Sequence, residues 1–255
     1  MMLSIPVAVM AWAANNFVPA VILETTAAWP FWVRVLASAV VGEIGYYWGH
    51  RWSHEVPFLW RFHCIHHSAE DLDYLVATRA HPIDFVFGRI CMYAPMLVLG
   101  LTGPGKEGEV QIPLYVSLFG MFVGFFIHAN VRWRFGFLEW IIATPGFHHW
   151  HHTKYGPINH NYSSTFPWVD WIFRTAYLPK NQSPESFGIG ATIPESLIGQ
   201  LVYPFENPKP GDFAAAMAAE AEPASAVATT EAESPAAVVN STDSNSSEVP
   251  PAVPL

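Results

Sequence analysis

The chain contains three groups of histidines, His50-Arg-Trp-Ser-His54, His63-Cys-Ile-His66-His67 and His148-His149-Trp-His151-His152. All 12 histidines lie between residues 50 and 160. Neutral imidazole is the commonest protein ligand for metal ions, and residues three or four positions apart lie on one face of a helix. We therefore expect the histidine groups to build a metal site on short helices.

The spacing also predicts how these helices run and how many ions they hold. The first group continues a helix that begins in an apolar stretch, and Pro57 separates it from the helix of the second group. Eight imidazoles exceed the ligands that one tetrahedral or octahedral ion binds, so we predict two metal ions. The eight are His50, His54, His63, His66, His67, His148, His151 and His152.

The composition indicates a membrane protein. Hydrophobic residues make up 51% of the chain and charged residues 13%, against about a quarter charged in soluble domains. The two cysteines, Cys64 and Cys91, are too few for a disulfide framework, a four-cysteine iron–sulfur cluster or a zinc ribbon. The net charge is −9, and no basic surface for nucleic acid is visible.

The composition changes after residue 206. Residues 207–255 are rich in Ala, Ser, Glu and Pro and carry much of the negative charge. Such a segment buries too little apolar surface to offset the entropy lost on ordering. We expect a working domain at residues 1–206 and a disordered tail at residues 207–255.

Three stretches approach the roughly 20 apolar residues that span a bilayer, namely residues 31–49, 84–103 and 112–130. Residues 3–23 are interrupted by prolines and asparagines, so we expect a poor membrane segment there. Crossings at the three stretches would leave all the histidines on one side. The last two stretches could instead form a hairpin that only dips into the bilayer, and this alternative leaves the histidines on the same side.

The basic residues give the orientation. Eight lie on the histidine side, against Lys106 and Arg34 on the other, and cytoplasmic loops are enriched in Lys and Arg. We therefore expect the metal site on the cytosolic face. The eight are Arg51, Arg61, Arg79, Arg132, Arg134, Lys154, Arg174 and Lys180.

The segments around the third histidine group suit a membrane surface. Residues 137–142 are amphipathic and precede Thr144-Pro145-Gly146, which predicts an interfacial helix, a turn and a further helix. The aromatic run at residues 166–173 is expected at the membrane–water boundary.

Other motif matches fail on their context. His54-Glu55 begins a zinc-protease H-E-x-x-H, but position 58 is Phe. The G-x-G-x-x-G match at residues 103–108 joins two apolar stretches and follows no strand, so we interpret it as a turn. No Glu stands three residues before a histidine, which excludes the carboxylate-rich di-iron bundle.

The three groups resemble the histidine boxes of the fatty acid hydroxylase and sterol desaturase superfamily. The matching patterns are His50-x-x-x-His54, His63-x-x-His66-His67 and His148-x-x-His151-His152, with Leu59-Trp60, His81-Pro82, Ile127-His128, Asn161-Tyr162 and Trp171-x-Phe173-x-Thr175 around them. The resemblance covers about residues 31–178. One departure is Arg174, which stands where the family often has glycine.

The resemblance implies an all-α integral membrane protein with about four membrane helices and a cytosolic helical cap. It implies two non-haem iron ions, O2 as co-substrate and a lipid substrate. The eight box histidines carry over as ligands, and His128 matches a lone histidine that family members place before the third box. His81 is either a ligand or a hydrogen-bond donor to one, while His149 and His160 are expected in ordinary polar or supporting roles.

Glu43 lies seven residues before His50, inside an apolar stretch and on the same helical face. An ionisable group there is a functional-site hypothesis. We expect either a hydrogen bond to a box histidine or extension of the side chain to the membrane surface.

The function predicted from these features is O2-dependent hydroxylation of an unactivated C–H bond of a lipid. Neutral ligands would leave two irons strongly charged and therefore strongly oxidising. A desaturase of the same superfamily is the alternative, and a membrane protein that binds or transports zinc without catalysis is a third interpretation. The chain has no flavin or nicotinamide motif, so we expect a separate electron donor of the ferredoxin or cytochrome type.

Overall fold

The computed structural model describes residues 12–13, 16–101, 111–180 and 182–206. These residues form helices, and their only β contact is an isolated bridge between Thr153 and Phe187, which confirms the all-α prediction for the described part of the chain. The predicted tail at residues 207–255 and most of the stretch at residues 3–23 lie outside the described residues.

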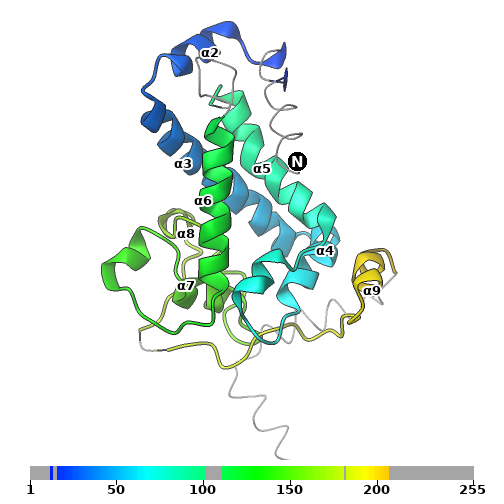
Figure 1. The fold of residues 1–255 in the computed structure, drawn as a ribbon. Coiled ribbons are helices and arrows are strands. Elements are labelled where there is room, and N and C mark those ends of the chain that lie inside the picture. Colours follow the sequence, from blue (N-terminus) through cyan, green and yellow to red (C-terminus); the bar gives the residue numbers. More distant parts are fainter. Residues whose placement is uncertain (1–11, 14–15, 102–110, 181, 207–255) are drawn as a thin grey trace, which may run out of the picture. The chain divides into compact units, whose positions relative to one another are not determined.

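The elements follow one another as shown in Figure 1. They are α2 (Ala20–Ala27), α3 (Phe31–Glu55), α4 (Pro57–His67), the 3-10 turn η1 (Tyr74–Thr78), α5 (Pro82–Val98), α6 (Gln111–His128), η2 (Gly136–Trp140), α7 (Pro145–His151), α8 (Trp168–Phe173), α9 (Leu197–Val202) and η3 (Tyr203–Phe205).

Helix α3 is the longest of these elements, with 25 residues, and it packs against α4, α5, α6 and α8. It ends at Glu55, because Val56 adopts an extended conformation and Pro57 begins α4. Proline is well suited to a first helical turn, where its missing N–H would have no partner. The predicted break between the first two histidine groups is therefore confirmed.

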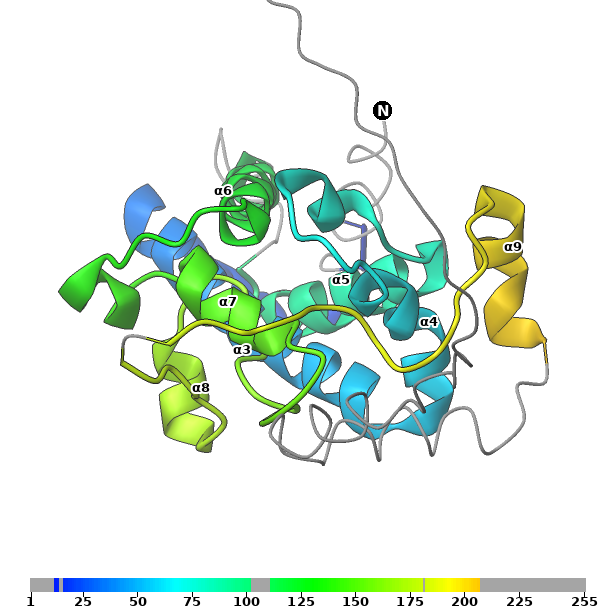
Figure 2. The same ribbon diagram turned by 90° about the horizontal axis from the view of Figure 1, so that it is seen from below.

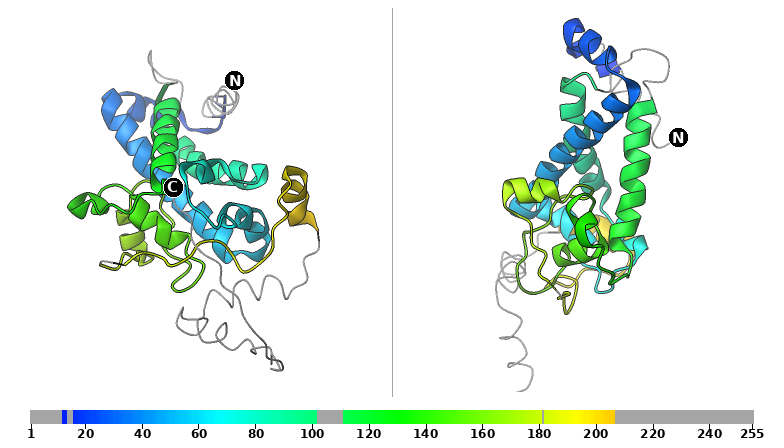
Figure 3. Two further views of the ribbon diagram at one scale, coloured as in Figure 1. Left: turned by 60° about the horizontal axis from the view of Figure 1, so that its bottom comes forward. Right: turned by 90° about the vertical axis from the view of Figure 1, so that its left-hand side faces the viewer.

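Helices α3 and α5 approach each other closely at two glycines of α3. A Cβ atom on Gly49 would lie 2.6 Å from the Cβ of Cys91, and one on Gly45 would overlap the Cys91 carbonyl oxygen. Two views show α6 beside this pair (Figures 1 and 3). The close packing holds the middle of α5 against α3 beside His50.

The predicted apolar stretches coincide with helices, although their lengths differ from the prediction. Residues 31–49 lie within α3, while α5 ends at Val98 and α6 ends at His128. Among the described residues, none of the helices combines the length and the apolar character needed to cross a membrane. The expected four membrane-spanning helices are therefore not confirmed in the described part of the chain.

The histidine-bearing elements gather at one end of α3 and α6. Figures 1 and 2 place α4 and α7 at this end, and α7 packs against α6. The amphipathic residues expected to form a helix make only the short 3-10 turn η2, and α7 then begins at Pro145. The third histidine group is thereby brought to the first two.

Candidate metal centre

Nine buried histidines converge in two groups, each of which could hold a metal ion. Within each group the candidate ligand atoms all lie within 4.8 Å of one another. The five-histidine group consists of His50, His54, His63, His67 and His151. The four-histidine group consists of His66, His128, His148 and His152.

The five-histidine group has the ligand spacing of a metal site. The Nε2 atom of His63 lies 3.0 Å from that of His50 and 3.1 Å from that of His67. Two nitrogen ligands bound about 2.1 Å from one ion at right angles are about 3.0 Å apart. The converging ring nitrogens therefore have the separation that a shared ion imposes.

The four-histidine group has the same spacing. The Nε2 atom of His128 lies 3.3 Å from that of His66 and 3.0 Å from that of His148. The Nε2 atoms of His148 and His152 are 3.1 Å apart. The two groups adjoin, since the rings of His67 and His152 stack with their centroids 4.3 Å apart.

The two groups do not follow the order of the sequence motifs. Histidines four residues apart on one helix enter the same group, as His63 and His67 do in α4 and as His148 and His152 do at α7. His66, the third histidine of the second motif, belongs to the four-histidine group. His151, from the third motif, belongs to the five-histidine group. Helices α4 and α7 thus each contribute ligands to both candidate metal sites.

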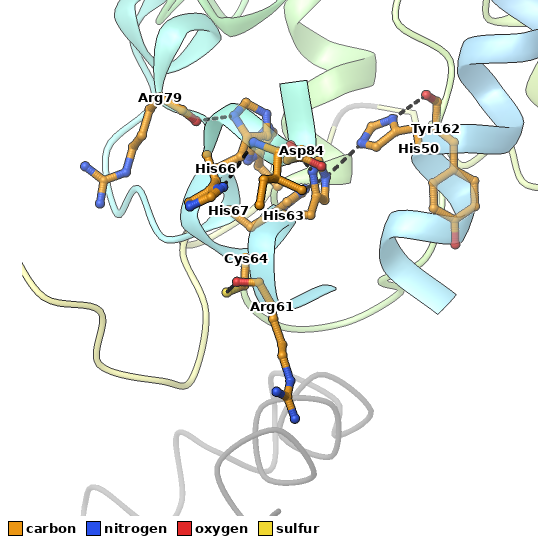
Figure 4. Close-up of polar contacts among 12 residues, drawn as sticks. His50, Arg61, His63, Cys64, His66, His67, Arg79, Asp84 and Tyr162 are labelled. Atoms are coloured by element: carbon orange, nitrogen blue, oxygen red, sulfur yellow. Dashed lines mark hydrogen bonds and ion pairs between the residues drawn. The ribbon is translucent and has the colours of Figure 1, made fainter. Parts of the chain in front are cut away.

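Carbonyl oxygens orient four of the rings. The Nδ1 atom of His50 donates to the Tyr162 carbonyl over 2.6 Å (Figure 4). Equivalent bonds join His151 to His160, His66 to Arg79 and His128 to Gly124, at 2.8, 3.0 and 2.7 Å. A proton held on Nδ1 leaves the Nε2 lone pair free to bind a metal ion.

The fifth oriented ring is that of His63. Its Nδ1 atom lies 3.0 Å from the carboxylate of Asp84 in α5 (Figure 4). No helical spacing links these residues, which are 21 positions apart. Asp84 therefore could not be predicted from the sequence, and neither could the carbonyl acceptors, since any residue has a carbonyl.

Burial keeps the rings of His50, His54 and His151 neutral. Removal from water lowers the pKa of His50 to about 3 and holds the pKa values of His54 and His151 well below 6.5. The Nε2 atoms of His54 and His151 are buried without a hydrogen-bond partner in the described part of the chain. Because an unpaired buried polar atom is unfavourable, these lone pairs fit metal coordination.

Residues 161–166 form a loop that supports the five-histidine group through the hydrogen bond between His50 and the Tyr162 carbonyl. The Asp170 carboxylate accepts hydrogen bonds from the backbone N–H groups of Tyr162 and Ser163, both at 2.8 Å. Asn161 is buried in the same loop and donates to the Phe147 carbonyl over 2.8 Å. These bonds hold the Tyr162 carbonyl that accepts from His50.

Glu43 contributes to the same support. Its carboxylate accepts from the backbone N–H groups of Ser164 and Thr165 at 2.7 and 2.8 Å. The side chain is buried and bonds to the loop, whereas the sequence analysis expected a bond to a histidine or extension to a membrane surface. Glu43 thus joins the middle of α3 to the loop that supports the metal centre.

Three histidines lie outside both groups. The His81 side chain caps α5 by accepting from the Ile83 N–H over 3.1 Å. The rings of His149 and His160 hydrogen-bond to the carbonyls of Ala129 and Ile158. These side chains have structural contacts outside the groups, and the backbone carbonyl of His160 accepts the hydrogen bond from the ring of His151.

Comparison with known proteins agrees with this geometry. The model of the fatty acid hydroxylase family matches residues 35–175. The ornithine lipid hydroxylase OlsE of Rhizobium tropici is 33% identical over 180 residues, which cover 70% of this chain and 52% of that protein. No solved structure matches the chain.

An animal and a plant contain relatives as well. The alkylglycerol monooxygenase of Homo sapiens is 35% identical over 54% of this chain and 29% of its own length. The methylsterol monooxygenase 2-2 of Arabidopsis thaliana is 28% identical over 57% of this chain and 54% of its own length. The chain thus spans about half or less of the length of these relatives. The family match over more than half of the chain confirms the resemblance seen in the histidine motifs, and the chain belongs to the fatty acid hydroxylase family.

Proposed function

We propose that this protein is an O2-dependent lipid hydroxylase that holds two iron ions, one in each histidine group. The convergence of nine buried histidines into two adjoining groups carries the proposal. The names of its relatives, which include an ornithine lipid hydroxylase and an alkylglycerol monooxygenase, support the reaction type.

The residues of the chain would hold the ions and exclude water. The nine imidazoles provide uncharged ligands, and the hydrogen bonds to Nδ1 fix the ring orientations before an ion binds. When bound, the two irons would supply activation of O2 and oxidation of the C–H bond. Deep burial limits the access of bulk water, and this protects the reacting groups from side reactions.

The reaction needs an electron source outside this chain. Conversion of a C–H bond and O2 into C–OH and water consumes two electrons and two protons. The two cysteines of the chain are too few for a four-cysteine iron–sulfur cluster. We therefore propose a separate donor protein of the ferredoxin or cytochrome type.

We further propose that the protein is embedded in a membrane with the histidines on the cytosolic side. Large apolar side chains are exposed on the outer surfaces of the long helices, including Trp32 and Leu36 on α3, Ile90 on α5 and Phe122 on α6. Such surfaces indicate contact with lipid or another apolar partner. The excess of basic residues at the histidine end supports the orientation.

The proposed substrate is a membrane lipid with a long acyl or alkyl chain. Desaturation remains the alternative reaction at the same centre, and the hydroxylase and monooxygenase names of the relatives favour hydroxylation. Comparison of the lipids of cells with and without the gene would identify the substrate. A product heavier by one oxygen atom supports hydroxylation, whereas a product lighter by two hydrogens supports desaturation.

Activity tests would separate the enzyme from a zinc-binding protein. The iron-loaded protein, supplied with donor and lipid, should incorporate one oxygen atom from 18O2 into its product. His67→Ala and His151→Ala should abolish turnover. His149 lies outside both groups, so His149→Ala should keep a turnover rate within tenfold of the wild-type rate. Stable zinc binding without oxygen consumption contradicts the proposal.

A further inference from the structure

The two histidine groups differ in the charge of the groups that support them. Asp84 lies in the first turn of α5, and its Oδ2 atom is 3.0 Å from His63 Nδ1. The Asp84 side chain is 13% exposed and that of His63 is 5% exposed. Within the described residues, this is the one close contact between a carboxylate and a histidine ring.

The Asp84 carboxylate is held in place by its surroundings. Ser53 of α3, between two histidines of the five-histidine group, also hydrogen-bonds to it. The start of α5 adds the partial positive charge of a helix N-terminus, which favours an ionised carboxylate there. Three helices thus meet at Asp84, with α3 and α5 fixing the ring of a histidine on α4.

No described residue gives the four-histidine group a comparable charged partner. His66 and His128 donate to the backbone carbonyls of Arg79 and Gly124. The Nδ1 atoms of His148 and His152 have no hydrogen-bond partner in the part of the chain that the structure describes. The group thus has one fewer histidine and only uncharged acceptors.

These differences have a consequence for metal affinity. A carboxylate that accepts the Nδ1 proton makes the ligating Nε2 more basic and offsets part of the charge of the ion, and loss of such a partner typically weakens metal binding by about 10- to 100-fold. An additional histidine ligand strengthens binding further. Both effects favour the five-histidine group.

We infer that Asp84 is a positioning residue that makes the five-histidine group the tighter metal site, so that the two sites fill in a fixed order. The inference rests on the proposed two-metal function and adds an order of loading to it. Asp84 acts through His63, without contact to the ion.

The experiment is a metal titration of the full-length protein in detergent, after removal of bound metal with a chelator. Co²⁺ is added without oxygen in the presence of a competing chelator, and the visible absorption of the bound Co²⁺ is followed. The wild type should bind two Co²⁺ ions in two steps that differ at least tenfold in affinity. His148→Ala should remove the weaker step and leave the tighter one.

The decisive variant is Asp84→Asn, which keeps the size and an acceptor oxygen but removes the charge. This variant should lower the Co²⁺ affinity of the tighter step by about 10- to 100-fold. The Co²⁺ affinity of the weaker step should stay within threefold of the wild-type value. Asp84→Glu should recover part of the loss. Asp71→Asn removes the same charge from an exposed residue and should change neither step.

The outcomes distinguish this inference from the proposed function. A wild type that binds fewer than two Co²⁺ ions contradicts both. Two clear steps that Asp84→Asn leaves unchanged, or a loss confined to the weaker step, contradict the role of Asp84 alone. Should Asp84→Asn fail to fold by circular dichroism, Ser53→Ala removes a donor to the same carboxylate and must weaken the tighter step, and an unchanged step then overturns the inference.

Discussion

Glu43 is a buried carboxylate whose partners are backbone N–H groups of a distant loop. It accepts from Ser164 and Thr165, more than a hundred residues away in the chain. The sequence identified Glu43 as unusual, because a charged residue interrupts an apolar helix. Its partners could not be predicted, because any backbone N–H can donate and no pattern marks the loop.

Replacement of Glu43 tests this interpretation. Glu43→Gln should lower the free energy of unfolding by about 1–3 kcal/mol, since the backbone donors lose a charged acceptor. Denaturant unfolding of the protein in detergent measures the change, and Glu185→Gln on an exposed residue is the control. Equal effects of the two substitutions would contradict the loop-anchoring role.

Arg174 adopts a left-handed backbone conformation, with φ at 61°, directly after α8. A residue with a Cβ atom is strained there by about 1–2 kcal/mol, which explains the frequent glycine that the family resemblance suggested at this position. Arg174→Gly should therefore raise the melting temperature. The free energy of unfolding should rise by about 0.5–1 kcal/mol, because the greater conformational entropy of glycine in the unfolded chain offsets part of the relieved strain.

The matched control for that substitution is Arg174→Ala. Alanine removes the exposed guanidinium but keeps the Cβ atom, so the backbone strain remains. Only the glycine variant should gain stability. A gain of the same size in both variants would assign the effect to the side-chain charge.

At the level of the helices, the stability of the fold depends on the close contact between α3 and α5. Gly45→Ala would place a Cβ atom against the Cys91 carbonyl, and the resulting separation of the helices should cost about 1–3 kcal/mol. The same shift moves Asp84 relative to His63, so the metal content should also fall. Thermal unfolding and metal analysis measure the two effects.

A second glycine provides the comparison. Gly120 lies inside α6, and a Cβ atom there would meet nothing within 4 Å. Gly120→Ala should be neutral or stabilise by up to about 1 kcal/mol, because alanine favours a helix interior. A loss of stability at Gly120 as large as that at Gly45 would contradict the close-packing explanation.

The histidine helices show how far the sequence predicts the site. The i, i+4 spacing places His63 and His67 on one face, and these two do share a group. The third member, His66, is turned away from that pair by the helical twist and enters the other group. That assignment depends on how α4 packs against α6 and α7, and packing of distant elements is not encoded in local spacing.

The molecule as a whole should lose stability in acid when it is free of metal. Burial holds the pKa of His50 at about 3, compared with 6.5 in an unfolded chain, and lowers the pKa values of His67 and His152 in the same direction. Below about pH 6.5 the unfolded chain therefore binds protons that the folded chain excludes, and the unfolding free energy falls. Each such histidine contributes up to about 1.4 kcal/mol per pH unit.

The melting temperature of the metal-free protein measures this effect. It should be nearly constant above about pH 7.5 and should fall steadily from about pH 6.5 to about pH 5. Bound metal should oppose the fall until protons displace it from the histidines. A melting temperature that does not change over this range would contradict the buried, neutral state of the rings.

The helical class, the break at Pro57 and eight of the nine converging histidines could be predicted from local spacing and residue type. The ninth, His128, was expected from the family resemblance alone. The sequence overestimated the regular structure of residues 137–142, where the 3-10 turn η2 forms in place of the expected interfacial helix. It also left out Asp84, whose partner His63 is distant in sequence. The membrane arrangement and the identity of the ions stay predictions.

We propose that each of the two histidine groups holds one iron ion. The most direct measurement is the number of iron ions per chain after anaerobic loading and removal of excess metal. We expect two iron ions in the wild type and one in the double variant His128→Ala, His148→Ala, which keeps all five histidines of the other group. Fewer than two in the wild type, or two in the double variant, would contradict it.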